Sequence, residues 1–203
     1  MKKWIKAEIS IAVGLIVAIL FSVCGFSSDC AKVRENVVRL HILANSDSDA
    51  DQTVKLLVRD ALLESGMRIF SGTTYVNDAV NILEEEKDVI ISVAENVLHE
   101  NGFDYNVSVS LEKEYFATRM YENFTMPAGE YLALRIIIGN GEGKNWWCVM
   151  FPPLCLPAAG EQTDIDAILG EDGTKLIQSN SKYEMRFKIV ELFERIKTEI
   201  KNG

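Results

Sequence analysis

The sequence predicts a single α+β domain behind an N-terminal signal peptide or membrane anchor. Helical and strand patterns fall in separate stretches, and an apolar run stands alone at the N-terminus. The 203 residues suffice for one hydrophobic core. We therefore expect residues 1–27 to be the targeting segment and residues 28–203 to form one domain. That domain should contain an antiparallel sheet of about four strands, two long helices after the first strand and a C-terminal helix.

The N-terminal segment has the layout of a signal peptide. Three lysines precede an apolar run over residues 9–23, and small or polar residues follow. Because the positive charges stay in the cytoplasm, the chain after about Ser28 should lie outside the membrane. The run is intermediate in length between a signal peptide and a spanning helix. We favour cleavage near residues 25–27 over a retained anchor, a lipidated Cys24 or a buried core helix.

The first half of the domain reads as one strand and two helices. Residues 37–44 are β-branched and almost continuously apolar, which predicts a central strand. Helix-capping residues follow, and apolar side chains then recur at helical spacing over residues 49–67. A second helical stripe occupies residues 76–99 and ends at Asn101 and Gly102, a typical C-terminal stop.

The second half of the domain reads as strands and then a helix. Apolar residues alternate with polar ones over residues 105–111, which predicts a half-exposed strand. Extended segments at 115–124, 131–138 and 146–150 follow, and the glycines at 139–143 predict a turn between the last two. Residues 183–200 carry apolar side chains at helical spacing and predict a last helix.

Charge and cysteine content narrow the class of protein. The net charge of −9 disfavours binding to nucleic acid, so membrane association should depend on the N-terminal segment. Cys148 and Cys155 flank a segment with two prolines whose bend favours a disulfide, although two buried thiols are the alternative. Cys30 would then be an unpaired thiol in a stalk near the membrane. We expect no cofactor and no metal site, because neither His41 nor His99 lies at a zinc-ligand spacing from the thiols.

No motif for catalysis accompanies the nucleophiles. Ser46 lies near His41 in sequence, and Cys148 or Cys155 could pair with a histidine, but none has a supporting pattern. Strand alternation should place Trp146 and Trp147 on opposite faces of the sheet, which leaves one available for an interface. The alternative is that both tryptophans are buried against the helices.

Several long segments of unusual composition resemble the stage II sporulation protein R family. They are Arg39 to Ser48, Asp51 with Gln52 and residues 55–61, Met126 to Tyr131, and Ile138 to Cys155. The resemblance implies a protein made in the forespore and exported into the space between the forespore and mother-cell membranes. It further implies a signalling ligand that activates a membrane-embedded aspartic protease, which then processes the precursor of sigma factor E.

The resemblance implies no catalytic residue, and we expect the protein not to be an enzyme. Our hypothesis is that Arg39, His41, Asn45, Trp146 and Trp147 contact the protease or hold the contact surface. Two other classes compete. One is an exported hydrolase that uses Cys155 or Ser46 with His41, and the other is a structural envelope protein anchored by residues 9–23.

Overall fold

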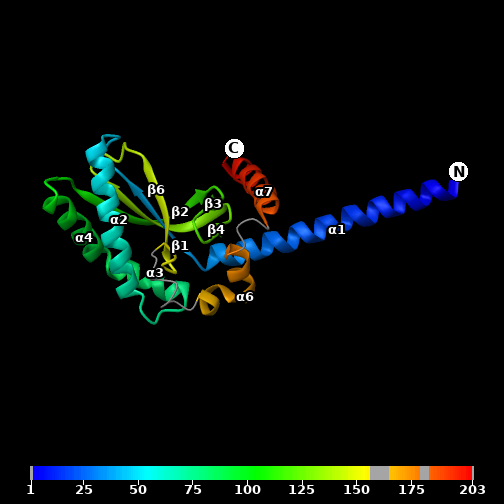
Figure 1. Ribbon diagram of the computed structural model, residues 1–203, viewed down its shortest axis with the longest axis horizontal. Helices are drawn as coiled ribbons and strands as arrows, with labels where there is room; N and C mark the ends of the chain where they lie inside the picture. Colours follow the sequence, from blue (N-terminus) through cyan, green and yellow to red (C-terminus); the bar gives the residue numbers. More distant parts are fainter. Residues whose placement is uncertain (1, 156–164, 179–182, 203) are drawn as a thin grey trace.

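A four-stranded mixed sheet forms the centre of the computed structural model, which describes residues 2–155, 165–178 and 183–202 (Figure 1). The strands are β1 (Val38–Leu43), β2 (Val107–Phe116), β5 (Gly129–Ile138) and β6 (Asn145–Phe151), in the order β2-β5-β1-β6. The architecture is α+β, as predicted.

The expectation of an antiparallel sheet is wrong for one pair of strands. β5 pairs antiparallel with β2 but parallel with β1, whereas β6 pairs antiparallel with β1. The helices after β1 carry the chain to the far edge of the sheet, and β5 then returns into the gap between β2 and β1. Side-chain alternation is the same in both kinds of pair, so strand direction could not be read from the pattern.

Three helices separate β1 from β2: α2 (Asp49–Ile69), α3 (Val76–Glu85) and α4 (Lys87–Glu100). Ser48 caps α2 by accepting a hydrogen bond from the backbone N–H of Asp51. The helix predicted over residues 76–99 is divided at Glu86. Consecutive glutamates occupy this end of α3, where negative charge opposes the helix dipole and favours termination.

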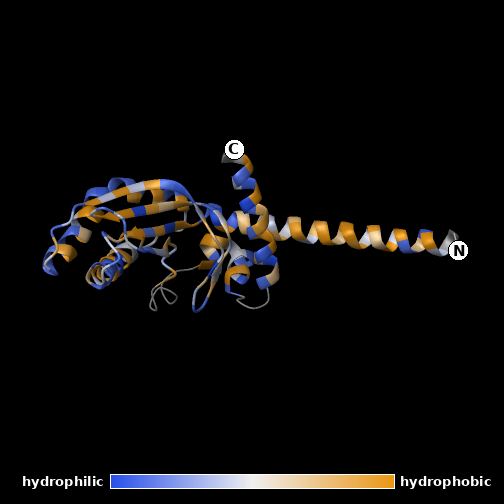
Figure 2. Ribbon diagram, turned by 90° about the horizontal axis from the view of Figure 1, so that it is seen from above, coloured by the Kyte–Doolittle hydropathy of each residue, from blue (hydrophilic) through white to orange (hydrophobic). Residues whose placement is uncertain are grey.

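The N-terminal helix α1 (Lys2–Glu35) runs without interruption from the isolated N-terminus into the body (Figure 1). Among the described residues, one helix, Trp4–Glu35, is long and apolar enough to span a membrane. Figure 2 shows its apolar N-terminal part projecting beyond the rest of the protein. The C-terminal end of α1 is packed against the rest of the protein, because Phe26, Cys30 and Val33 are buried. The expected stalk around Cys30 is therefore wrong: this segment is a packed helix.

Two further helices and a small hairpin complete the described structure. The predicted C-terminal helix is present as α7 (Glu184–Asn202), and α6 (Ile165–Gln178) precedes it. The extended segment expected over 115–124 instead ends β2 and enters the hairpin of β3 (Arg119–Met120) and β4 (Thr125–Met126).

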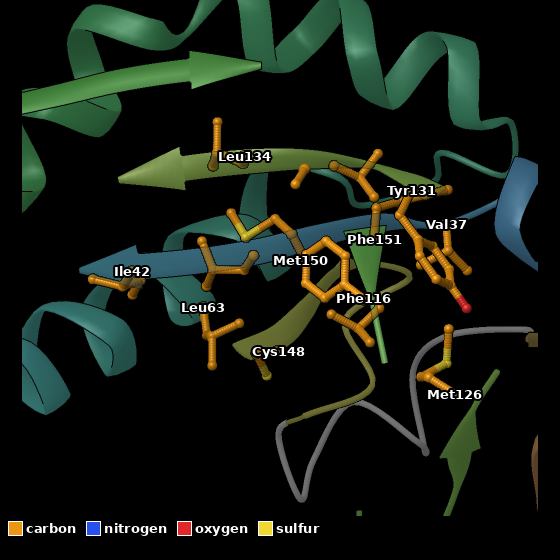
Figure 3. Close-up of a cluster of buried hydrophobic side chains, with 14 of the residues drawn as sticks. Val37, Ile42, Leu63, Phe116, Met126, Tyr131, Leu134, Cys148, Met150 and Phe151 are labelled. Atoms are coloured by element: carbon orange, nitrogen blue, oxygen red, sulfur yellow. The ribbon is translucent and has the colours of Figure 1, made fainter. Parts of the chain in front are cut away.

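The core lies between the sheet and α2 and α4, and extends to the end of α1. Figure 3 shows Ile42 and Met150 near Leu63 of α2, and Leu134 and Phe151 belong to the same cluster of buried side chains. Burial of each such side chain contributes about 1.5–3 kcal/mol to folding. This packing fixes the sheet and therefore the positions of the side chains on its other face.

Candidate functional site

The two faces of the sheet differ in what covers them. Leu40 and Ile42 of β1 point toward α2 and α4, whereas Arg39 and His41 point the opposite way. We call this second side the open face. The strand registers place on it Ser108, Ser110, Glu112 and Glu114 of β2, Arg135 and Ile137 of β5, His41 and Leu43 of β1, and Asn145 and Trp147 of β6.

His41 is the centre of the open face. Its Nδ1 lies 2.9 Å from Oε2 of Glu114 and its Nε2 lies 2.8 Å from Oδ1 of Asn145. The imidazole also stacks on the indole of Trp147, with ring centroids 3.7 Å apart. The two ring nitrogens thus connect Glu114 of β2 to Asn145 of β6.

Trp147 is held from two sides and is still partly exposed. Phe116 meets its indole edge-on, with a centroid separation of 4.9 Å, while His41 stacks on it. A rigid aromatic side chain with an accessible surface is the type of group that anchors protein interfaces. Trp147, which the sequence analysis named as a candidate contact residue, is thus exposed enough to contact a partner.

Arg39 is fully buried beneath the same face. Its Nε donates to the carbonyl of Cys148 at 2.8 Å, and its Nη2 donates to the hydroxyl of Tyr121 at 2.8 Å. The guanidinium carbon lies 4.3 Å from the ring centroid of Phe116 and 5.1 Å from that of Tyr131. These contacts tie β1 to β2, β5 and β6, so the position of Arg39 fits a role in holding the surface rather than touching a partner.

Asn45 connects the loop after β1 to the turn between β5 and β6. Its Oδ1 accepts a hydrogen bond from the backbone N–H of Asn140, and its Nδ2 donates to Asp51. The turn fits closely, because a Cβ added at Gly139 would overlap the side-chain oxygen of Asn45. The N–H of Gly143 also donates to the carbonyl of Ala44. The glycine-rich run therefore forms the predicted turn between β5 and β6, and these contacts lock it onto the loop after β1.

Asp51 anchors this loop with its carboxylate. Ser46 Oγ donates to it at 2.5 Å, Asn45 Nδ2 at 3.0 Å and Tyr105 OH at 3.1 Å. Burial alone would raise the pKa of Asp51, but these hydrogen bonds to the charged form outweigh burial and lower the pKa from its ordinary value. Asp51 is therefore an ionised structural acid at neutral pH.

Trp146 lies on the opposite face of the sheet from Trp147, in agreement with the predicted alternation. The guanidinium of Arg59 on α2 lies 4.5 Å from the centroid of the Trp146 ring. This residue thus belongs to the packing between β6 and α2. The structure separates the tryptophan pair into one side chain on each face.

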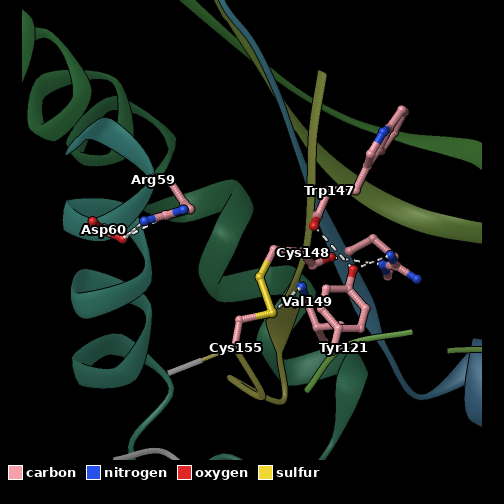
Figure 4. Close-up of a disulfide and its surroundings, with 8 residues drawn as sticks. Arg59, Asp60, Tyr121, Trp147, Cys148, Val149 and Cys155 are labelled. Atoms are coloured by element: carbon pink, nitrogen blue, oxygen red, sulfur yellow. Dashed lines mark hydrogen bonds and ion pairs between the residues drawn. A yellow bond between two sulfur atoms is a disulfide. The ribbon is translucent and has the colours of Figure 1, made fainter. Parts of the chain in front are cut away.

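The disulfide between Cys148 and Cys155 is formed and lies on the α2 side of β6, on the opposite face of the sheet from Trp147 (Figure 4). Cys155 Sγ accepts a hydrogen bond from the N–H of Val149, and the Tyr121 hydroxyl donates to the carbonyl of Trp147. Burial raises the pKa of Tyr121 from its ordinary value, so the hydroxyl stays protonated and available as a donor. These contacts fix the backbone that carries Trp147.

The groups suggested for a hydrolase are not brought together. Ser46 Oγ donates to Asp51, while both nitrogens of His41 are engaged by Glu114 and Asn145. Cys155 is in the disulfide. Within the described ranges, no group of three or more histidine, cysteine or acidic side chains is arranged to hold a metal ion.

Sequence reasoning missed Glu114, Asn145, Phe116 and Tyr121. Glu114 is distant from His41 in sequence. The strand order β2-β5-β1 places both side chains on one face, where they meet across β5. Asn145 stands next to the tryptophan pair in the sequence, but its position opposite Leu43 and beside His41 appears only in the folded sheet. Phe116 and Tyr121 were expected in an extended segment, and no contact was predicted for either side chain.

Comparisons with known proteins agree with the sequence resemblance. The family model for stage II sporulation protein R matches residues 34–161. The stage II sporulation protein R of Bacillus subtilis (strain 168) is 38% identical over 141 residues, which are 66% of this chain and 63% of that protein. The match thus spans less than two thirds of the relative's length. No solved structure matches.

The matched region contains the open face, the locked β1 loop and both disulfide cysteines. It begins in the last turn of α1, at Arg34. The chain belongs to the stage II sporulation protein R family.

Proposed function

We propose that this chain is an exported signalling ligand of sporulation whose open face docks on a membrane-embedded aspartic protease. Docking activates the protease to process the precursor of sigma factor E. Family membership supports the role in sporulation. The receptor, its activation and the location between the forespore and mother-cell membranes are expectations from the family resemblance.

The observation that carries the proposal is the construction of the open face around Trp147. The indole is held in place by His41 and Phe116, and polar side chains with partial exposure surround it. A surface ordered before binding loses little conformational entropy when a partner docks. Recognition therefore requires no rearrangement of the core beneath it.

Two features support export. The apolar N-terminal part of α1 suits a signal peptide or an anchor. The Cys148–Cys155 disulfide suits an oxidising compartment outside the cytoplasm. Both features support a location of the open face outside the cytoplasm, where a receptor exposed to the intermembrane space could contact it.

We propose further that the protein acts as a ligand and not as an enzyme. Its candidate nucleophiles are engaged: Ser46 by Asp51 and Cys155 by Cys148. His41 is enclosed by Glu114, Asn145 and Trp147, so its role is to hold the surface.

Co-expression in a non-sporulating host tests the proposal. The full chain, the protease and the sigma precursor are produced together, and shortening of the precursor is followed by immunoblot. A variant without residues 2–23 keeps the buried Phe26, Cys30 and Val33 but cannot be exported. We expect shortening with the full chain and none with this variant. Equal shortening by both would contradict action from outside the membrane.

A further inference from the structure

The C-terminal helix α7 carries an apolar stripe on its outer side. The stripe consists of Met185, Ile189, Leu192, Phe193, Ile196 and Ile200, which are each 46–76% exposed. They recur at helical spacing and therefore line one side of the helix. Elsewhere in the described structure, large exposed apolar side chains gather on α1, whereas only isolated ones occur on the body.

The inner side of α7 is firmly packed, so the stripe has a fixed direction. Phe187 and Val190 are buried, and the Phe187 ring lies 5.3 Å from that of Phe26 on α1. Glu194 is also buried and forms a 3.1 Å ion pair with Arg34. These residues already attach α7 to the end of α1. The stripe is therefore a separate, outer surface of the helix and not the side that packs on the domain.

The stripe begins where the apolar run of α1 ends. Ile189 lines a small cavity together with Ser22 and Val23 of α1. The apolar surfaces of the two helices are thus continuous at this point. Figures 1 and 2 both show α7 crossing α1 at the place where α1 leaves the body.

The charge of α7 also differs from that of the whole chain. The helix contains five basic and four acidic residues, a balance of +1, while the chain carries −9. A helix with an apolar side, a charged side and low overall hydrophobicity is typical of the membrane interface. Its charge balance avoids the repulsion from anionic headgroups that the rest of the body would experience.

From the continuity with α1 and this local charge, we infer that the α7 stripe binds the surface of the bilayer that α1 enters. The bilayer then contacts the domain through both helices. This contact sets the orientation of the open face relative to the membrane, and it would keep the domain at the membrane surface after any cleavage near residues 25–27.

Fluorescence in vesicles tests the inference on the full chain. In a Cys24→Ser background, single cysteines are introduced by Phe193→Cys on the stripe or by Met120→Cys on the body, and each is labelled with a nitrobenzoxadiazole dye. Cys30 is buried and Cys148 and Cys155 are paired, so they do not compete for the label. Met120 is a matched control, because it is 60% exposed and Phe193 is 59% exposed.

The labelled proteins are reconstituted into vesicles of phosphatidylethanolamine and phosphatidylglycerol. We expect a blue-shifted emission and quenching by doxyl-labelled lipid at position 193, whereas iodide in the water should quench only the label at 120. Equal quenching of both labels by iodide would overturn the inference. Protection at 193 without lipid quenching, increasing with the protein-to-lipid ratio, would assign the stripe to a second copy of the chain and would overturn it as well.

Discussion

His41 and Trp147 face each other on neighbouring strands and stack with ring centroids 3.7 Å apart and an interplanar angle of 20°. The stack is central to the open face, because His41 also contacts Glu114 of β2 and Asn145 of β6. One imidazole thus links side chains from both edge strands of the sheet. Substitution of His41 should therefore alter the shape of the open face and should not abolish a catalytic step.

The substitution His41→Gln separates a ligand from a hydrolase. Glutamine can replace one of the two polar contacts but not the stacking, so we expect precursor processing to fall by less than about tenfold. Loss of a catalytic base would reduce the rate by about 10²–10⁴-fold. The measurement is the initial rate of precursor shortening at matched levels of folded, exported protein. A fall in the larger range would support the hydrolase.

The substitution Arg39→Lys should destabilise the protein by about 2–4 kcal/mol. A lysine cannot donate to both the Cys148 carbonyl and the Tyr121 hydroxyl while covering the ring of Phe116, and hydrogen bonds to charged groups contribute about 1.5–3 kcal/mol each. Urea unfolding of the full chain in detergent micelles measures the effect. The control is Arg135→Lys, since the Arg135 side chain is 34% exposed and its ion pair with Glu112 should contribute at most about 1 kcal/mol. Equal losses in the two variants would contradict a special structural role for Arg39.

Asp51 should make stability depend on acidic pH. Its folded-state pKa is lowered, so its contribution is complete above the unfolded pKa of about 3.9 and disappears as pH falls through the folded value. Asp51→Asn should lack this part of the dependence, and urea unfolding at a series of acidic pH values measures it. Asp60→Asn is the control, because the Asp60 side chain is 56% exposed beside Arg59. A parallel loss of stability in Asp51→Asn and the unchanged protein would contradict this role of Asp51.

Reduction of the disulfide should lower the free energy of unfolding by about 2.5 kcal/mol. The cysteines are seven positions apart, and closing a loop of this length removes a corresponding part of the unfolded-state entropy. Unfolding with and without dithiothreitol measures the difference. A Cys148→Ala/Cys155→Ala double variant should not respond to the reductant. No response in the unchanged protein would mean that the two thiols are free.

The fold was largely predictable where the pattern was local. Residues 37–44 and 183–200 carried clear strand and helix periods, and both elements are present. Strand direction was not predictable, because β1 and β5 become parallel neighbours only after the helices have crossed the sheet. The break at Glu86 and the burial of Cys30 also depend on packing between distant elements.

The site was predictable only in part, for a similar reason. The hypothesis named His41 and Trp147, which meet on the open face. It also named Arg39, which is buried beneath that face, and Trp146, which lies on the opposite side of the sheet. Asn45 lies between these cases, half-buried in the locked loop. The contact with Glu114 spans 73 positions and follows from sheet order, which a single sequence does not display.

The central claim is that the open face docks on the protease, and a matched pair of arginine substitutions tests it most directly. Ser108→Arg adds a bulky charge to the exposed end of the open face, while Ser92→Arg adds the same group to the exposed surface of α4 behind the sheet. Both variants should be exported and folded, as measured by secretion and urea unfolding. In co-expression with the protease and the sigma precursor, we predict that Ser108→Arg abolishes or strongly reduces precursor shortening and that Ser92→Arg does not. Undiminished shortening with Ser108→Arg would contradict docking through this face.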